Sequence, residues 1–309
     1  MLKKSLFVIF LVVFVVLAVR LFLTFSPVSK LVSPWENGRA GVNLWFPQAK
    51  ASSSLTGAPD LPAGRQGLTA KAVYFVDINS GQVLFEKNSR QRLPVASLVK
   101  IMTAVVTLEN KGWSDNVLVS ERAAGMEPDS MLLKMGESLT VEELLYGVFL
   151  VSANDSAEAL AETSTKSRED FLSQMNTKAV QLGMRDTVFI NPTGLEEDGR
   201  EQYSTAYDVA IMARYAIKNF PHLVDISSAP HIILPETPAH QDYDLYSGIN
   251  LLTTYPGVLG FKTGYTPEAG LTLVTLAEKE GHKVLGVLLG SQNRREEAKE
   301  LLDYSFSIR

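Results

Sequence analysis

The first 25 residues carry almost no polar positions, which sets them apart from the rest of the chain. Residues 6–19 are all apolar, Arg20 interrupts, and residues 21–25 extend the stretch to about 20 residues, enough to cross a bilayer. Lys3 and Lys4 would stay on the cytoplasmic side. A cleaved secretory signal is the alternative, but no A-x-A pattern occurs before Pro34. The pattern predicts a membrane anchor over residues 1–25 with the rest of the chain on the extracytoplasmic side, or a secreted protein if the segment is cleaved.

Beyond the anchor, the hydrophobic pattern changes period along the chain. Residues 26–68 lack a sustained period and are rich in Pro, Gly, Ser and Ala, which is typical of a tether. The body, residues 69–309, has strand patterns at both ends and helix patterns between them. Strands are expected over residues 72–77, 82–86, 271–277 and 283–289, and helices over 98–108, 141–150, 157 onward and 296–306. This order predicts an α/β (α+β) fold, with an antiparallel sheet flanked by helices and an inserted helical lobe.

Composition removes several classes of chemistry. The chain has no cysteine, which excludes disulfides, thiol nucleophiles, iron–sulfur clusters and cysteine-ligated zinc. Its four histidines form no metal-binding pair, which argues against a His-rich metal site or a Ser-His-Asp triad. With 29 basic and 34 acidic residues, the net charge is −5 and leaves no basic excess for nucleic acid. We therefore expect no metal, no cofactor and no nucleic-acid partner.

A serine–lysine pair is the first candidate for chemistry. Ser97 and Lys100 form the only Ser-x-x-Lys in the chain, and this spacing places both side chains on one face of a helix. A partly buried lysine has a lowered pKa, and its neutral form accepts the proton of a serine hydroxyl. At a helix start, the backbone N–H of Ser97 is also available to an oxyanion. The alternative is a helix-capping serine beside a solvated lysine.

Lys262, Thr263 and Gly264 form a second cluster, in a turn that feeds a short strand. The glycine lets a ligand approach the backbone, while the lysine and threonine offer a cation and a hydroxyl to an anion. A phosphate-binding P-loop is excluded because Phe261 stands where that loop has glycine. An ordinary β-turn with a surface lysine is the alternative.

Two Ser-x-Asn tripeptides lie between Ser-x-x-Lys and Lys-Thr-Gly, so a choice is needed. Ser114 and Asn116 lie in a polar turn shortly after the Ser-x-x-Lys motif. Ser152 and Asn154 follow the apolar stretch 141–150, on a loop that a rigid, buried element would hold in place. We therefore assign Ser152 and Asn154 to the site and interpret Ser114 as a turn residue.

Ser-x-x-Lys, Ser-x-Asn and Lys-Thr-Gly, in this order, form a signature of class A β-lactamases and penicillin-binding proteins. Residues 94–104, 191–195, 250–252 and 255–266 closely resemble serine-type D-alanyl-D-alanine carboxypeptidases, the low-molecular-mass penicillin-binding proteins (peptidase S11-like). The resemblance covers residues 69–306. It implies a β-lactamase/transpeptidase-like fold and a hydrolase that removes the terminal D-alanine from peptidoglycan stem peptides ending in D-Ala-D-Ala. It also implies covalent inhibition by β-lactams.

The resemblance further implies catalytic roles. Ser97 would be the acylated nucleophile and Lys100 its proton acceptor, while Ser152 would relay protons and Asn154 would hold the substrate amide. The middle position of that motif is Ala153, which offers no polar group to the reaction. The family's common C-terminal β-domain and trailing anchor are missing, so the N-terminal segment is expected to provide the anchoring.

For substrate binding, the resemblance implies that Lys262 and Thr263, beside Gly264, hold the terminal carboxylate. The backbone N–H groups of Ser97 and Tyr265 would form the oxyanion hole. A second cation is expected to share the carboxylate, since a guanidinium fork suits it best, and Arg294 and Arg295 are the candidates. The alternative, which the pattern slightly favours, is that both arginines begin a solvated helix and pair with Glu296 or Glu297.

Three other functions stay open at this point. Endopeptidase action on cross-links would use the same residues. A class A β-lactamase needs a glutamate that activates water, and no Glu-x-x-Leu-Asn-like segment occurs between Asn154 and Lys262. A catalytically inactive wall-binding protein would have no need of Ser97 and Lys100.

Overall fold

The computed structural model describes residues 67–308, so the predicted anchor and almost all of the predicted tether lie outside the described residues. No helix within residues 67–308 combines the length and the hydrophobicity that crossing a membrane requires. The strands are β1 (Ala72–Asp77), β2 (Val83–Lys87), β3 (Leu93–Pro94), β4 (Asn116–Leu118), β5 (Ser138–Thr140), β6 (Tyr203–Ser204), β7 (His231–Leu234), β8 (Tyr243–Tyr246), β9 (Val258–Thr266), β10 (Gly270–Lys279) and β11 (His282–Ser291). The helices are α2 (Lys100–Asn110), α3 (Glu121–Ala124), α4 (Val141–Tyr146), α5 (Asn154–Ser164), α6 (Arg168–Gln181), α7 (Ala206–Asn219), α8 (His222–Ser228), α9 (Leu251–Thr254) and α10 (Arg294–Ser307), with a 3₁₀ turn η1 (Ala96–Val99) and a π-helical turn η2 (Gly147–Val151).

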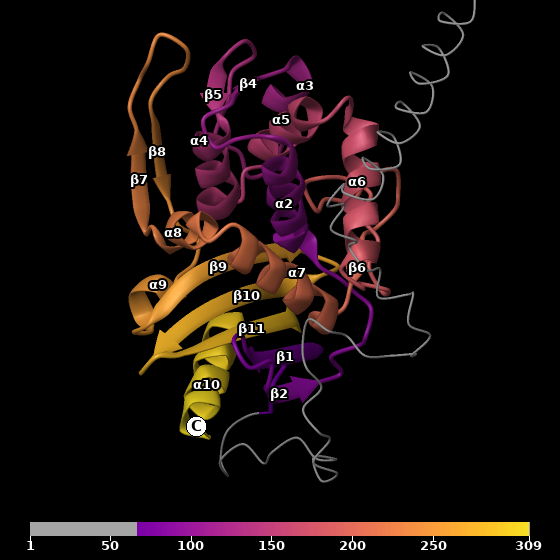
Figure 1. The fold of residues 1–309 in the computed structure, drawn as a ribbon, viewed down its shortest axis with the longest axis vertical. Helices are drawn as coiled ribbons and strands as arrows, with labels where there is room; N and C mark the ends of the chain where they lie inside the picture. Colours follow the sequence, from indigo (N-terminus) through magenta and orange to yellow (C-terminus); the bar gives the residue numbers. More distant parts are fainter. Residues whose placement is uncertain (1–66, 309) are drawn as a thin grey trace, which may run out of the picture. The chain divides into compact units, whose positions relative to one another are not determined.

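The two ends of the described chain meet in one five-stranded antiparallel sheet, in the order β2-β1-β11-β10-β9 (Figure 1). The predicted hairpin of β1 and β2 is confirmed, and β1 pairs along its length with β11. Strands β10 and β11 are longer than predicted, because Glu280 and Gly281 alone make the turn between them. Both residues have positive φ, 52° and 78°, as a two-residue hairpin turn requires.

Both faces of the sheet are covered, and the period-two pattern of β1 shows how. Tyr74 and Val76 contribute to the large core shared with α2 and α7, while Val73 and Phe75 contribute to the smaller core beneath α10. The Phe75 ring packs over Gly286 on β11, where any added Cβ would overlap the ring. The predicted arrangement, a sheet flanked by helices and completed by both ends of the body, is confirmed.

The inserted lobe lies between β2 and β9 in sequence and contains α2 to α6 (Figure 1). Helix α4 begins at a capping box, in which the Thr140 hydroxyl and the Glu143 carboxylate each accept the other residue's backbone N–H. After Tyr146 the helix widens into η2, so the apolar stretch predicted as one helix has two parts. The next helix, α5, begins at Asn154, earlier than the predicted residue 157. Its early start follows from Asp155, a buried first-turn carboxylate that accepts three backbone N–H groups.

Candidate active site

Ser97 and Lys100 lie where the 3₁₀ turn η1 passes into α2. The Lys100 amine is 3.0 Å from the Ser97 hydroxyl oxygen. Lys100 is wholly buried, whereas Ser97 remains 8% exposed. The three-residue spacing therefore places an accessible hydroxyl against an inaccessible amine, the arrangement that a nucleophile and its proton acceptor require.

Two further oxygens surround the Lys100 amine. It donates to the side-chain oxygen of Asn154 at 2.7 Å and to the backbone carbonyl of Thr193, also at 2.7 Å. Burial lowers the pKa of Lys100 from 10.5 to about 7, against the opposing charges of Asp129 and Asp155. A lysine with this pKa is partly neutral at physiological pH and can accept the serine proton.

A second serine–lysine pair faces the first. The Lys262 amine on β9 lies 2.9 Å from the Ser152 hydroxyl and 2.8 Å from the Thr263 carbonyl oxygen. Burial lowers the pKa of Lys262 well below its usual value, and the positive charges of Lys100 and Arg294 lower it further. Ser152 follows the π-helical turn with a φ of 61°, a left-handed conformation that costs a non-glycine residue about 1–3 kcal/mol.

The predicted binding residues lie within β9 rather than in a turn that feeds it. Lys262 and Gly264 are buried, Thr263 is half-buried, and Tyr265 is 61% exposed. The strand spans nine residues and pairs with β10 from Val258 to Thr266. Its length holds the Lys-Thr-Gly segment rigidly, because a turn would lack these ladder hydrogen bonds.

Two glycines bring other backbone segments against the nucleophile. A Cβ on Gly264 would stand 2.9 Å from the Ser97 nitrogen, and one on Gly194 would overlap the Ala96 carbonyl. Gly194 also has a φ of 94°, which L side chains rarely adopt. The Ser97 amide thus lies directly beside Gly264 on β9, the residue before Tyr265, which is expected to supply the second N–H donor.

The structure separates the two Ser-x-Asn tripeptides. Ser152 and Asn154 each bond one of the buried lysines. Ser114 and Asn116 are exposed, and among residues 67–308 no hydrogen bond joins either of them to those lysines or to Ser97. Asn116 instead begins β4, which pairs with β5.

The two candidate arginines have different surroundings. Arg294 donates to the carbonyl oxygens of Gly264 at 2.7 Å and Thr272 at 3.2 Å, so its guanidinium lies directly behind the Lys-Thr-Gly segment. Arg295 is half-exposed and pairs with Glu296 at 2.6 Å. The alternative that the sequence pattern favoured was a pair of arginines on a solvated helix, paired with Glu296 or Glu297. It is correct for Arg295 and wrong for Arg294, the first residue of α10, whose side chain points back toward β9.

Sequence reasoning assigned no role to Thr193. Its contribution is a backbone carbonyl, which every residue possesses, so its type carries no signal. The resemblance of residues 191–195 to the carboxypeptidases was the only pointer to this loop.

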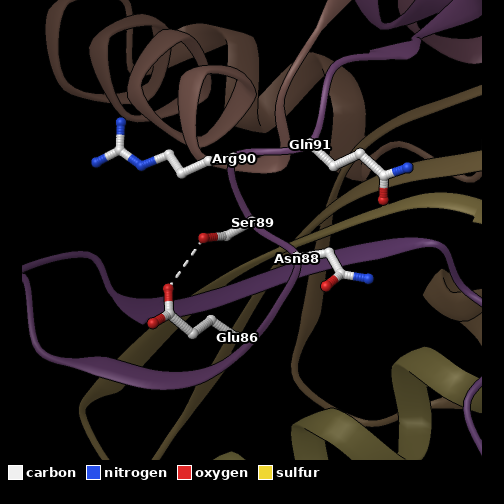
Figure 2. Close-up of a pocket in the computed structure, with 5 residues that line it drawn as sticks. All are labelled: Glu86, Asn88, Ser89, Arg90 and Gln91. Carbon is white, nitrogen blue, oxygen red and sulfur yellow. Dashed lines mark hydrogen bonds between the residues drawn. The ribbon is translucent and has the colours of Figure 1, made fainter. Parts of the chain in front are cut away.

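Figure 2 shows a hollow elsewhere on the surface, lined by Glu86, Asn88, Ser89, Arg90 and Gln91. Two of its polar side chains already have partners: Ser89 donates to Glu86 at 3.0 Å, and the Arg90 guanidinium lies 3.3 Å from the centre of the Tyr207 ring. None of the serine–lysine groups lines it. Residues 67–308 also contain no cluster of three or more His, Asp or Glu residues able to hold a metal ion.

Comparison with known proteins places this geometry in a family. The family model described as D-alanyl-D-alanine carboxypeptidase (peptidase S11) matches residues 60–293. The chain belongs to this family. It is therefore a serine peptidase, and its penicillin-recognising fold is the predicted β-lactamase/transpeptidase-like fold. Covalent penicillin binding is characteristic of the family.

Three relatives of this chain illustrate the match. D-alanyl-D-alanine carboxypeptidase DacF of Bacillus subtilis is 39% identical over 77% of the chain, which spans 62% of that relative's length. The D-alanyl-D-alanine carboxypeptidase structure from Mycobacterium tuberculosis aligns with a TM-score of 0.73 at 30% identity, covering 80% of this chain and 96% of that one. Penicillin-binding protein D2 of Listeria monocytogenes, in its cefotaxime-bound form, aligns with a TM-score of 0.65 at 28% identity, covering 78% of this chain and 99% of that one.

Proposed function

We propose that this chain is a D-Ala-D-Ala carboxypeptidase that removes the terminal D-alanine of peptidoglycan stem peptides through an acyl-enzyme on Ser97. The observation that carries the proposal is the buried Lys100 amine, 3.0 Å from the Ser97 hydroxyl and with a pKa near 7. This pair supplies a nucleophile and a proton acceptor without histidine or metal.

In the first step, the Ser97 oxygen attacks the carbonyl carbon of the penultimate D-alanine while the Lys100 amine takes the hydroxyl proton. The N–H groups of Ser97 and Tyr265 stabilise the oxyanion. The carbon–nitrogen bond then breaks, and the departing amine receives a proton through the Ser152 hydroxyl. Water hydrolyses the resulting ester and regenerates Ser97. Asn154 holds the peptide amide while it anchors Lys100.

The terminal carboxylate is bound beside β9 in this proposal. Thr263 supplies a half-buried hydroxyl, and Lys262 with Arg294 supplies positive potential behind the strand. Arg294 is the permanent charge of the two, because guanidinium does not deprotonate in proteins. Residues 1–25 would anchor the catalytic body at the extracytoplasmic face of the membrane, where the stem peptides are.

Mass spectrometry of the intact protein and its products, after incubation with a pentapeptide ending in D-Ala-D-Ala, tests the activity. We expect one D-alanine released per peptide and a stoichiometric penicillin adduct on Ser97. An intact pentapeptide, together with cleavage of a cross-linked peptide in a parallel incubation, would instead identify an endopeptidase. Rapid turnover of penicillin would identify a β-lactamase, although among residues 67–308 no carboxylate is hydrogen-bonded to Ser97 or Lys100.

Recognition of the carboxylate is tested by comparing the free-acid peptide with its C-terminal amide. Lys262→Ala is expected to raise KM for the acid far more than for the amide, and Arg294→Ala to show a smaller shift of the same kind. Arg295→Ala is the matched control, because its guanidinium pairs with Glu296 on the surface. Equal losses on acid and amide would show that these cations do not read the carboxylate.

A further inference from the structure

A network of ion pairs joins two parts of the lobe. It includes none of the residues assigned to catalysis. The Arg168 Nε lies 2.5 Å from Glu158 Oε1, and its Nη2 lies 3.0 Å from Glu197 Oε2. Arg122 is a second guanidinium on the same carboxylates, at 2.8 Å from Glu158 and 3.8 Å from Glu197. Arg168 thus uses the two sides of its fork to join two carboxylates, a geometry that a lysine cannot reproduce.

This network of ion pairs is unusual because Glu158 is buried. Its side chain is fully buried and that of Arg168 is 15% exposed, so solvent screens their attraction little. The second carboxylate oxygen of Glu158 has no hydrogen-bond partner among the described residues. The carboxylate is therefore held by its arginines alone, at a cost in desolvation that a surface pair would not incur.

Each end of this ion-pair network lies close to a residue whose oxygen accepts a hydrogen bond from the Lys100 amine. Glu158 lies one turn after Asn154 on the same face of α5. Glu197 belongs to the loop of residues 191–202, which also carries the Thr193 carbonyl. The Asn191 side chain links the loop internally, since it accepts the backbone N–H of Gly194 at 2.9 Å and its amide helps to lower the pKa of Glu197.

We propose that Glu158, Arg168 and Glu197 act as an ionic clamp that positions Lys100. The clamp ties the 191–202 loop to α5, so that the Thr193 carbonyl and the Asn154 side chain stay together around the lysine amine. Arg168 and Glu197 are positioning residues in this account, because neither touches Ser97 or Lys100. The inference rests on the proposed function, in which Lys100 is the proton acceptor.

Glu197→Gln is the most direct probe, because it removes the charge and keeps the size of a partly exposed side chain. We expect the penicillin acylation rate constant to fall about tenfold, since small misplacements of catalytic groups have large effects on rate. The midpoint of its pH profile is expected to rise above about 7. A loosened loop admits water to Lys100 and relieves the burial that lowers its pKa. The preference for free acid over amide is expected to stay unchanged, because β9 and α10 lie outside the clamp.

Two further variants make the test decisive. Arg168→Lys keeps the charge but reaches one carboxylate only, so it is expected to shift the rate and the midpoint as Glu197→Gln does. Glu196→Gln is the matched control, because Glu196 is exposed and forms no ion pair among the described residues. A rate loss without a midpoint shift, or a Glu197→Gln variant equal to Glu196→Gln, would overturn the clamp. Wild-type protein that fails to react with penicillin would instead overturn the proposed function.

Discussion

The active site contains two serine–lysine pairs that are alike in their atoms and unlike in how the chain holds them. The amine-to-hydroxyl distance is 3.0 Å in the Ser97–Lys100 pair and 2.9 Å in the Ser152–Lys262 pair. The first pair lies on one helical turn, whereas the second joins a lobe residue to a sheet strand across 110 positions of sequence. Similar local geometry can therefore come from helix periodicity or from the docking of a lobe on a sheet.

The two lysines have different surroundings, which suit them to different roles. Lys100 has two oxygen acceptors besides Ser97, and its pKa of about 7 lets it exchange protons near neutral pH. Burial lowers the pKa of Lys262 well below its usual value, and the charges of Lys100 and Arg294 also lower it. Ser152 is also held in a left-handed conformation, while Ser97 follows Ala96 with a φ of 50°. Backbone strain thus accompanies both hydroxyls, while the two lysines differ in their hydrogen-bond acceptors and in the charges around them.

The largest effect should separate the two serines. Ser97→Ala is expected to abolish covalent penicillin labelling and to leave the unfolding temperature nearly unchanged, because it removes a single hydroxyl and leaves the apolar packing intact. Ser152→Ala is the matched control and should still form an adduct, more slowly. Fluorescent penicillin and intact-mass measurement check both variants. Undiminished labelling of Ser97→Ala would place the nucleophile elsewhere and remove the basis of the comparison.

The next effect concerns the lysine of the first pair. Lys100→Ala is expected to lower the acylation rate constant by about 10²–10⁴-fold, the usual contribution of a positioned proton acceptor. Stopped-flow acylation measured under saturating penicillin separates this step from binding. A rate within a factor of two of wild type would show that Lys100 is not the base.

Asn154 sharpens the comparison, because it joins α5 to the lysine of the first pair. Asn154→Ala is expected to slow acylation about tenfold or more, since the buried Lys100 amine loses one of its hydrogen-bond acceptors. Asn116→Ala changes the same residue type in the other Ser-x-Asn tripeptide and should be nearly silent. The opposite result in the acylation assay would mean that the wrong tripeptide was assigned.

The smallest effect is a pH dependence that follows from the pKa of Lys100 in the first pair. Because burial lowers the pKa of Lys100 to about 7, its proton-accepting neutral form grows as pH rises through that value. Acylation should therefore increase about tenfold from pH 6 to pH 8 and then level off. A profile of penicillin acylation against pH checks the midpoint. A flat profile across this range would contradict a titrating Lys100.

The sequence alone was enough to predict the elements that depend on residues close together along the chain. Alternation predicted β1, β2, β10 and β11, and three-residue spacing predicted the contact of Ser97 with Lys100. Boundaries were less accurate where side chains from elsewhere intervene. Helix α5 begins three residues early because Asp155 accepts N–H groups from the loop that carries Met131 and Leu133.

By itself, the sequence determined the chemical inventory and the local order of this protein. It supplied a serine and a lysine on one helical turn, no cysteine, and strand patterns at both ends of the body. Only the tertiary structure decided which distant groups meet. It brought Ser152 to Lys262, the Thr193 carbonyl to Lys100, and Arg294 rather than Arg295 behind β9. The physical reason is that burial and long-range packing set these contacts and the lysine pKa values, whereas spacing along the chain governs only neighbours within a turn or a strand pair.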